Sequence, residues 1–204
     1  MNSQFKYALC GLAVYSTPVL SEENFSYTFL SATYSIFTEE LDGIENDFEG
    51  DGLEFDLMLN ATKNVAFMAS YGTGSADVSG NGNIVDAEVD GFSFGILLHM
   101  PVNESTDFIG GVGRTESTVD FELNGTFLES IDSHSNSIFI GVRAWASNKL
   151  ELRAIIDRSK SDDESDTDLN LSGSFYIDKT FSIDGNYFFD SEGSSIGFGI
   201  TKNF

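Results

Sequence analysis

The sequence predicts an all-β fold: a closed, antiparallel, up-and-down barrel of about ten strands that spans a membrane. Three observations predict it. Short segments alternate between apolar and small or polar residues along the chain, short turns alternate with longer acidic connections, and the last segment ends on an aromatic residue, Phe204. A spanning strand needs only ~9–11 residues, whereas a spanning helix needs ~20 apolar ones, and no stretch after residue 21 supplies them.

Composition narrows the function classes. The chain has 33 acidic and 10 basic residues and a formal net charge of -23. Nucleic-acid phosphates would be repelled by this charge, so we expect no nucleic-acid partner. The contents of 41% hydrophobic and 13% aromatic residues oppose disorder. Twenty Gly, 19 Phe and only two Pro indicate a chain rich in β-structure.

The first 21 residues resemble a secretory signal peptide, with a short basic region, an apolar stretch and small residues before a cut ahead of Glu22. The alternative is an ordered first strand. The single cysteine, Cys10, lies in this leader. We therefore expect one barrel domain over residues 22–204, without a disulfide or a thiolate metal site.

Ten segments carry the period-2 pattern of a strand. In order they are Phe25–Phe37, Gly52–Ala61, Val65–Val78, Gly91–Val102, Asp107–Phe121, Ser135–Ala146, Leu150–Ser161, Thr167–Ile177, Phe181–Asp190 and Ser195–Phe204. The alternate apolar residues that define the outer rows run over Leu30–Ile36, Leu53–Leu59, Val65–Tyr71, Phe92–Met100, Ile138–Ala144, Leu152–Ile156, Phe181–Tyr187 and Ile196–Ile200. The fifth segment is ambiguous, because its two rows are similar. The eighth is defined by the acidic loop before it and the turn after it.

The connections differ in kind at the two ends of the barrel. The short ones are Thr62–Asn64, Asn103–Thr106, Ser147–Lys149 and Asp178–Thr180, and the others are mostly longer and acidic. Short periplasmic turns, longer outer loops and an even strand count are typical of bacterial outer-membrane barrels. An eight-stranded barrel with a longer hairpin is the alternative count. A soluble β-sandwich is the alternative fold, because alternation alone does not exclude it.

Charged residues are costly against lipid, so we expect them to face the lumen. The predicted lumenal set is Glu54, Asp56, Arg114, Glu116, Arg143, Glu151, Arg153, Asp157 and Asp184. Arg114 is placed inward because exposure to lipid would cost ~2–4 kcal/mol at the midplane. Three arginines among several carboxylates predict an ion-pair network that fills a small barrel, in preference to a conducting pore.

One loop has the spacing of calcium ligands. Asp77, Ser79, Asn81, Asn83 and Glu88 stand at positions 1, 3, 5, 7 and 12 of a twelve-residue segment, with Gly82 at position 6. Oxygen ligands at this spacing can wrap around calcium. A Gly/Asn-rich hairpin explains the same residues by turn geometry alone. Calcium is the only cofactor that the sequence suggests.

The run Asp132-Ser133-His134-Ser135 has the residue types of a hydrolase triad. Neighbours in sequence cannot easily form the required relay, in which an acid orients a histidine that contacts a serine. We therefore expect a protein that is not an enzyme.

Four short motifs carry a family resemblance. They are Phe25–Thr28, Ser70–Asp77, Ile140–Arg143 and Gly199–Phe204. The chain resembles the small outer-membrane β-barrel domain family of Gram-negative bacteria, which includes porin-family and OmpA-like transmembrane barrels. The resemblance implies a structural or small porin-like protein in the outer membrane. It also implies contact with outer-membrane lipid and lipopolysaccharide, assembly by the barrel assembly machinery, and a monomer.

Gly199 and Phe204 belong to the carboxyl-terminal assembly signal that the resemblance implies. The chain departs from that signal at Lys202, where the family usually has an apolar or aromatic residue. Fold analogy supports location better than activity. A narrow channel, a surface adhesin that acts through acidic loops, and a soluble calcium-binding β-protein therefore remain alternatives.

Overall fold

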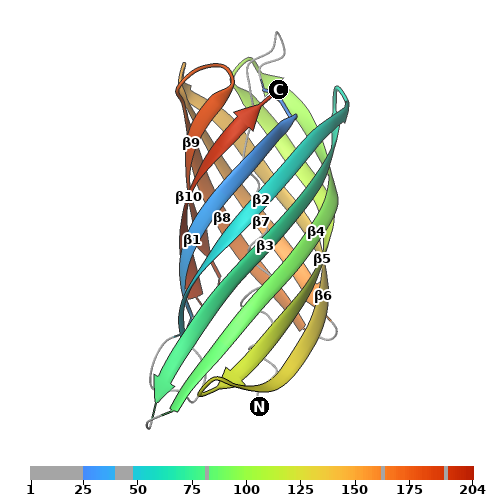
Figure 1. Cartoon of the computed structure of the whole chain (residues 1–204). Coiled ribbons are helices and arrows are strands. Elements are labelled where there is room, and N and C mark those ends of the chain that lie inside the picture. Colours follow the sequence, from blue (N-terminus) through green and yellow to red (C-terminus); the bar gives the residue numbers. More distant parts are fainter. Residues whose placement is uncertain (1–24, 40–47, 81–82, 162–163, 191–192) are drawn as a thin grey trace.

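The computed structural model describes residues 25–39, 48–80, 83–161, 164–190 and 193–204, which form one closed β-barrel (Figure 1). The strands are β1 Phe29–Glu39, β2 Phe48–Thr62, β3 Val65–Gly80, β4 Asn83–Asn103, β5 Thr106–Leu123, β6 Thr126–Ser147, β7 Leu150–Ser161, β8 Glu164–Tyr176, β9 Phe181–Phe189 and β10 Gly193–Asn203. Each strand pairs antiparallel with its neighbours in sequence, and β1 pairs with β10. The prediction of a ten-stranded barrel is confirmed. The predicted signal peptide over residues 1–21 lies outside the described residues.

The barrel closes between its first and last strands. Pairing runs without a break from Phe29 opposite Asn203 to Glu39 opposite Gly193. At Gly199 a Cβ atom would lie 2.7 Å from the Thr33 hydroxyl and 2.8 Å from the Ala32 carbonyl. Glycine therefore permits the close approach at this seam. Closure satisfies every backbone group within lipid and leaves no sheet edge.

The outer wall is apolar around the barrel. On β1 the outward side chains of Leu30, Tyr34 and Ile36 are 48%, 43% and 55% exposed. The inward side chains between them, Ser31 and Ser35 among others, are buried. A soluble sandwich would bury the apolar row, so this arrangement needs lipid on the outside. Among the described residues no helix is long and apolar enough to cross a membrane.

The pattern inverts at the loop end of the barrel. There a buried interior cluster is apolar and comprises Phe37, Ala76, Ala87, Val89, Val119 and Phe121. Outward at the same level, register places the carboxylates of Glu49, Asp77, Asp86 and Glu122 side by side on β2–β5. An apolar inside and a charged outside are typical of a wall in water. The inversion therefore marks where the strands leave the membrane.

Several predicted strand boundaries are wrong, and three of them bear on the architecture. β4 begins at Asn83 and not at Gly91, because the polar segment before Gly91 continues as paired strand. The long connection expected between Phe121 and Ser135 is a tight hairpin, and β6 begins at Thr126. Asn124 and Gly125 take φ values of 51° and 74° there, as the two central residues of a type I′ turn require. The first strand begins at Phe29, because residues 25–28 turn away from the wall.

Candidate functional site in the lumen

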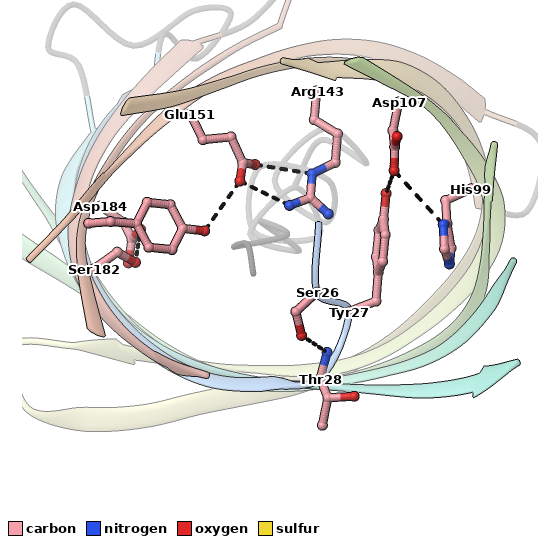
Figure 2. Close-up of polar contacts among 10 residues, drawn as sticks. Ser26, Tyr27, Thr28, His99, Asp107, Arg143, Glu151, Ser182 and Asp184 are labelled. Carbon is pink, nitrogen blue, oxygen red and sulfur yellow. Dashed lines mark hydrogen bonds and ion pairs between the residues drawn. The ribbon is translucent and has the colours of Figure 1, made fainter. Parts of the chain in front are cut away.

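The residues before β1 lie inside the barrel. Phe25 and Tyr27 are 4% and 1% exposed, and both belong to the interior cluster at the short-turn end. The backbone amide of Thr28 donates to the Ser26 hydroxyl at 3.2 Å, a local turn that directs the segment across the lumen (Figure 2). The other members of this cluster are Phe29, Met58, Ala66, Met68, Leu97, Ile109, Phe139 and Ile155, with Trp145 packed against it. Apolar burial holds the segment in the lumen.

We call residues 25–28 and the lumenal side chains that pack on them the plug. A buried ion pair lies at its centre. Arg143 on β6 and Glu151 on β7 flank the short turn at residues 148–149 and are 2% and 1% exposed. Arg143 donates from Nε to Glu151 Oε1 at 3.1 Å and from Nη2 to Oε2 at 3.0 Å. The Tyr176 hydroxyl donates to Oε2 at 3.2 Å. This two-point geometry is the strong form of an arginine–carboxylate contact, and Figure 2 shows it pointing into the lumen.

Two aromatic rings pack against the Arg143 guanidinium. Its Cζ atom lies 4.4 Å from the Phe25 ring centroid and 4.5 Å from that of Tyr27. Phe25 stacks on Trp145 with centroids 5.7 Å apart, and Trp145 lies 5.0 Å from Tyr176. A cation between desolvated aromatic faces gains up to ~2 kcal/mol per ring. The segment before β1 is therefore tied to the opposite wall through Arg143.

Asp107 and His99 also contact Tyr27. Its hydroxyl donates to Asp107 Oδ2 at 2.7 Å, and its ring stacks on His99 at 3.7 Å. His99 Nδ1 lies 3.9 Å from the same Asp107 oxygen, which is beyond hydrogen-bond distance. Neither ring nitrogen of His99 has a hydrogen-bond partner among the described residues. His99 therefore acts here as a flat surface against which Tyr27 packs.

The other predicted lumenal carboxylates are bound mainly by hydroxyl groups. Asp56 accepts from Ser31 at 2.7 Å, and Asp184 accepts from Ser182 at 2.9 Å and Thr201 at 2.8 Å. Glu54 is buried beside Asp56 on β2. Asp157 lies opposite Asp168 between β7 and β8.

The remaining lumenal arginine has a different environment. Arg153 is 6% exposed and lies within electrostatic range of Glu151 and Asp184. Its Nε atom has no hydrogen-bond partner among the described residues. Arg153 therefore adds positive charge to the plug without the two-point contact that Arg143 makes.

The prediction that Arg114 and Glu116 face the lumen is wrong. On β5 the inward positions are the odd ones, such as Ile109, Val119 and Phe121, so both charged residues point outward. Arg114 Nε contacts Glu116 Oε1 at 3.1 Å, with the side chains 38% and 60% exposed. Arg114 lies opposite Phe94 and Glu116 opposite Phe92, at the loop-side edge of the apolar wall, so the cost that applies at the membrane midplane does not apply here.

The hydrolase-like run cannot form a relay. Asp132 and His134 point outward, whereas Ser135 is buried on the inner face and Ser133 contacts the inward Ser117 at 2.8 Å. Strand alternation therefore separates the serines from the acid and the histidine by the thickness of the wall.

The predicted calcium residues lie on the hairpin of β3 and β4. Asp77 is exposed opposite Asp86, Glu88 is exposed opposite Ser75, and Asn81 lies outside the described residues. Within the described part of the chain, no group of three or more His, Cys, Asp or Glu side chains could hold a metal ion. Calcium binding here stays a prediction.

Sequence reasoning missed the plug itself. Phe25 and Tyr27 alternate with Ser26 and Thr28, and this apolar/polar alternation also predicts a strand. Asp107 was predicted only as the start of a strand, and His99 was given no role. One feature of the sequence could have indicated these contacts. Asp107, Arg143 and Glu151 are charged residues near short turns, and strand alternation directs each of them into the lumen.

Comparison with known proteins agrees with this architecture. Residues 7–187 match the model of a family described as "Outer membrane protein beta-barrel domain". The chain belongs to this family. Membership of this family places it in the outer membrane. A search of curated proteins found no match.

Solved structures of other outer-membrane barrels resemble this family member in fold. The transport unit of the autotransporter AIDA-I from Escherichia coli has 10% identity and a TM-score of 0.59, with 98% of this chain and 97% of that chain covered. The translocator domain of NalP from Neisseria meningitidis has 12% identity and a TM-score of 0.50, with 98% and 94% covered. Ail of Yersinia pestis has 14% identity and a TM-score of 0.46, with 86% and 96% covered. At these identities the likeness to the first two structures shows the fold alone.

The last strand of this family member carries an aromatic end with a basic neighbour. Phe204 is 69% exposed. Lys202 Nζ lies 4.7 Å from the Phe181 ring centroid and 5.9 Å from that of Phe204. The lysine stem thus follows the wall while its ammonium group reaches the membrane surface. The role of Gly199 and Phe204 as an assembly signal stays a prediction.

Proposed function

We propose that this protein is a structural, non-enzymatic outer-membrane barrel with a sealed lumen that does not conduct solutes. The observation that carries the proposal is the position of Arg143, which is held by Glu151 and packs against the rings of Phe25 and Tyr27. A pore needs charged side chains in contact with water, and this guanidinium is 2% exposed. The apolar clusters at both ends of the interior support the same view.

The proposal is tested by single-channel recording of the full barrel in a planar bilayer. We expect the unmodified protein to be silent. A variant with Phe25→Ala and Tyr27→Ala removes both rings and their contact with Arg143, and it should produce discrete openings. The matched control is Phe92→Ala with Phe94→Ala, which removes two aromatic rings from the outer wall and should stay silent. Steady conductance of the unmodified protein, unchanged by the loss of both lumenal rings, would refute the proposal.

A second candidate function is surface binding through the acidic outer face. The observation that favours it is the row of Glu49, Asp77, Asp86 and Glu122, which register holds on four neighbouring strands beyond the apolar wall. Such a row suits a basic partner. Whole cells that display the barrel should retain a fluorescent polylysine probe, and replacing these four residues by their amides should abolish the retention. Equal retention by both forms would remove this candidate.

A further inference from the structure

We propose that the outer wall of β5, β6 and β7 binds the phosphate groups of an outer-leaflet glycolipid. This site is separate from the lumen, and the positions of the basic residues indicate it. Among the described residues Lys63, Lys149, Lys179 and Lys202 lie at the short-turn end, and Arg143 and Arg153 lie in the lumen. The other three, Arg114, Arg158 and Lys160, all point outward on β5 and β7.

Register brings these three side chains together. Arg114 lies opposite Asn136, and Asn136 lies opposite Lys160, so the two basic residues are two strand spacings apart, about 10 Å. Arg158 is two residues before Lys160 on the same face, and its Nη2 donates to the Ser165 hydroxyl at 3.3 Å. We call Arg114, Arg158 and Lys160 the basic patch. Their long stems let all three reach a common phosphate group.

The basic patch lies at the depth of lipid headgroups. The next outward residues toward the short-turn end are apolar: Val112 below Arg114, Ile138 below Asn136 and Ile156 below Arg158. Short turns mark the periplasmic side in this architecture, so the basic patch borders the outer leaflet. Acyl chains against the apolar row would place a headgroup at the basic patch.

Arg114 keeps donors available for a phosphate group. Glu116 contacts it through Nε at 3.1 Å, which leaves the two terminal nitrogens of the guanidinium. Arginine forks of this kind bind phosphate at two points. A groove of about 440 Å³ on the other side of Arg114 lies over β3–β6 and is lined by Asp90, Glu116 and Asp132 among others, so a phosphate group would bind on the β6–β7 side of Arg114.

The rest of the outer face would repel the same ligand. Beyond the apolar wall, β2–β5 carry Glu49, Asp51, Asp77, Asp86, Glu88, Asp90, Asp120 and Glu122 on their outward rows. On the loop side of the apolar wall, phosphate therefore meets favourable charge only at the β5–β7 side of the barrel among the described surfaces. This asymmetry would orient the barrel relative to the glycolipids around it.

Native mass spectrometry of the full barrel with bis-phosphorylated lipid A tests the proposal. Replacing Arg114, Arg158 and Lys160 by glutamine should weaken binding roughly 100-fold, from about fivefold per basic residue near a membrane surface. The matched control replaces Lys63, Lys149 and Lys179 by glutamine, which removes the same charge at the opposite end and should leave binding unchanged. Heat-modifiable gel mobility confirms that both variants are folded.

Chemical removal of the lipid phosphates provides the second arm. Dephosphorylated lipid A should bind the unmodified barrel as weakly as phosphorylated lipid A binds the basic-patch variant. Equal binding by the basic-patch variant and the control would overturn the proposal. So would undiminished binding of the dephosphorylated lipid, because acyl contacts alone would then account for the association.

Discussion

The buried ion pair gives the sharpest prediction about stability. Glu151→Gln keeps the shape of the side chain but leaves the Arg143 cation, 2% exposed, without its counter-charge. Loss of one partner of a buried pair costs ~3–5 kcal/mol. The rings of Phe25 and Tyr27 at 4.4 and 4.5 Å still stabilise part of the charge, so we expect about 3 kcal/mol. For an unfolding slope of about 2 kcal/mol/M, the urea midpoint should fall by roughly 1.5 M.

The assay uses the only tryptophan of the chain. Trp145 packs against the interior cluster and stacks on Phe25, so its fluorescence reports both the barrel and the plug. Urea titration of the barrel in lipid vesicles, followed by this signal and by gel mobility, gives the free energy of unfolding. The matched control is Glu116→Gln in the exposed pair with Arg114, where we expect a loss below about 1 kcal/mol.

A double replacement completes the test. Arg143→Met with Glu151→Met removes both charges and fills similar volume, so its stability should return to within about 1 kcal/mol of the unmodified protein. If Glu151→Gln costs no more than the exposed control, the reasoning that ties the plug to Arg143 is refuted. The same conclusion follows if the double replacement is as unstable as the single one.

Three further predictions concern other parts of the barrel. Hydrogen bonds from Thr180 and the backbone lower the pKa of Asp178 in the β8–β9 turn, so its stabilising effect is complete above the unfolded pKa of ~3.9 and is lost as pH falls through the lower folded value. Asp178→Asn should therefore flatten the acid dependence of the urea midpoint. Gly111→Val should destabilise the barrel, since a Cβ there would meet the Phe139 ring at 2.5 Å, which urea titration would detect. If the β3–β4 hairpin binds calcium, calorimetry should record heat that Asp77→Ala or Glu88→Ala abolishes.

The lipid-facing wall was predictable because lipid imposes a strict rule. Every second residue must be apolar, and rows such as Phe92–Met100 on β4 obey it over the full membrane depth. The inward parity of Arg143 and Glu151 followed from the same rule, since their neighbours Val142 and Leu152 are clearly lipid-facing. Their contact also follows from position, because the two residues flank one short turn.

The rule fails on β5, where both rows look alike. The inner row there runs through Ile109, Gly111 and Gly113, which are no more polar than the outer row. Polarity then gives no direction, and the cost of exposing Arg114 to lipid at the midplane was applied to a residue at the edge of the apolar wall. On this strand the number of residues between the two turns determines which side chains face the lumen, and the composition of the rows does not.

The plug could not be predicted from the sequence, for a different reason. Phe25, Tyr27 and Phe29 continue one alternating row, and only the pairing of Phe29 with Asn203 and Met58 shows where the wall ends. That pairing depends on the register of three strands at once. A single sequence contains the residues of the plug without the closure that forces them inward.

The inversion of the pattern explains why this barrel is taller than a membrane needs. The outward apolar row of β4 spans nine residues, Phe92 to Met100, or about 30 Å along the strand and about 23 Å in height at a tilt of ~40°. The whole strand has 21 residues, about 70 Å along its length, so much of it stands in water. Without lipid on the outside, that part must supply its own core, and Val89, Val119 and Phe121 form it. The chain therefore meets two solvents with one sheet: its outer face is apolar where lipid surrounds it, and charged over an apolar interior where water does.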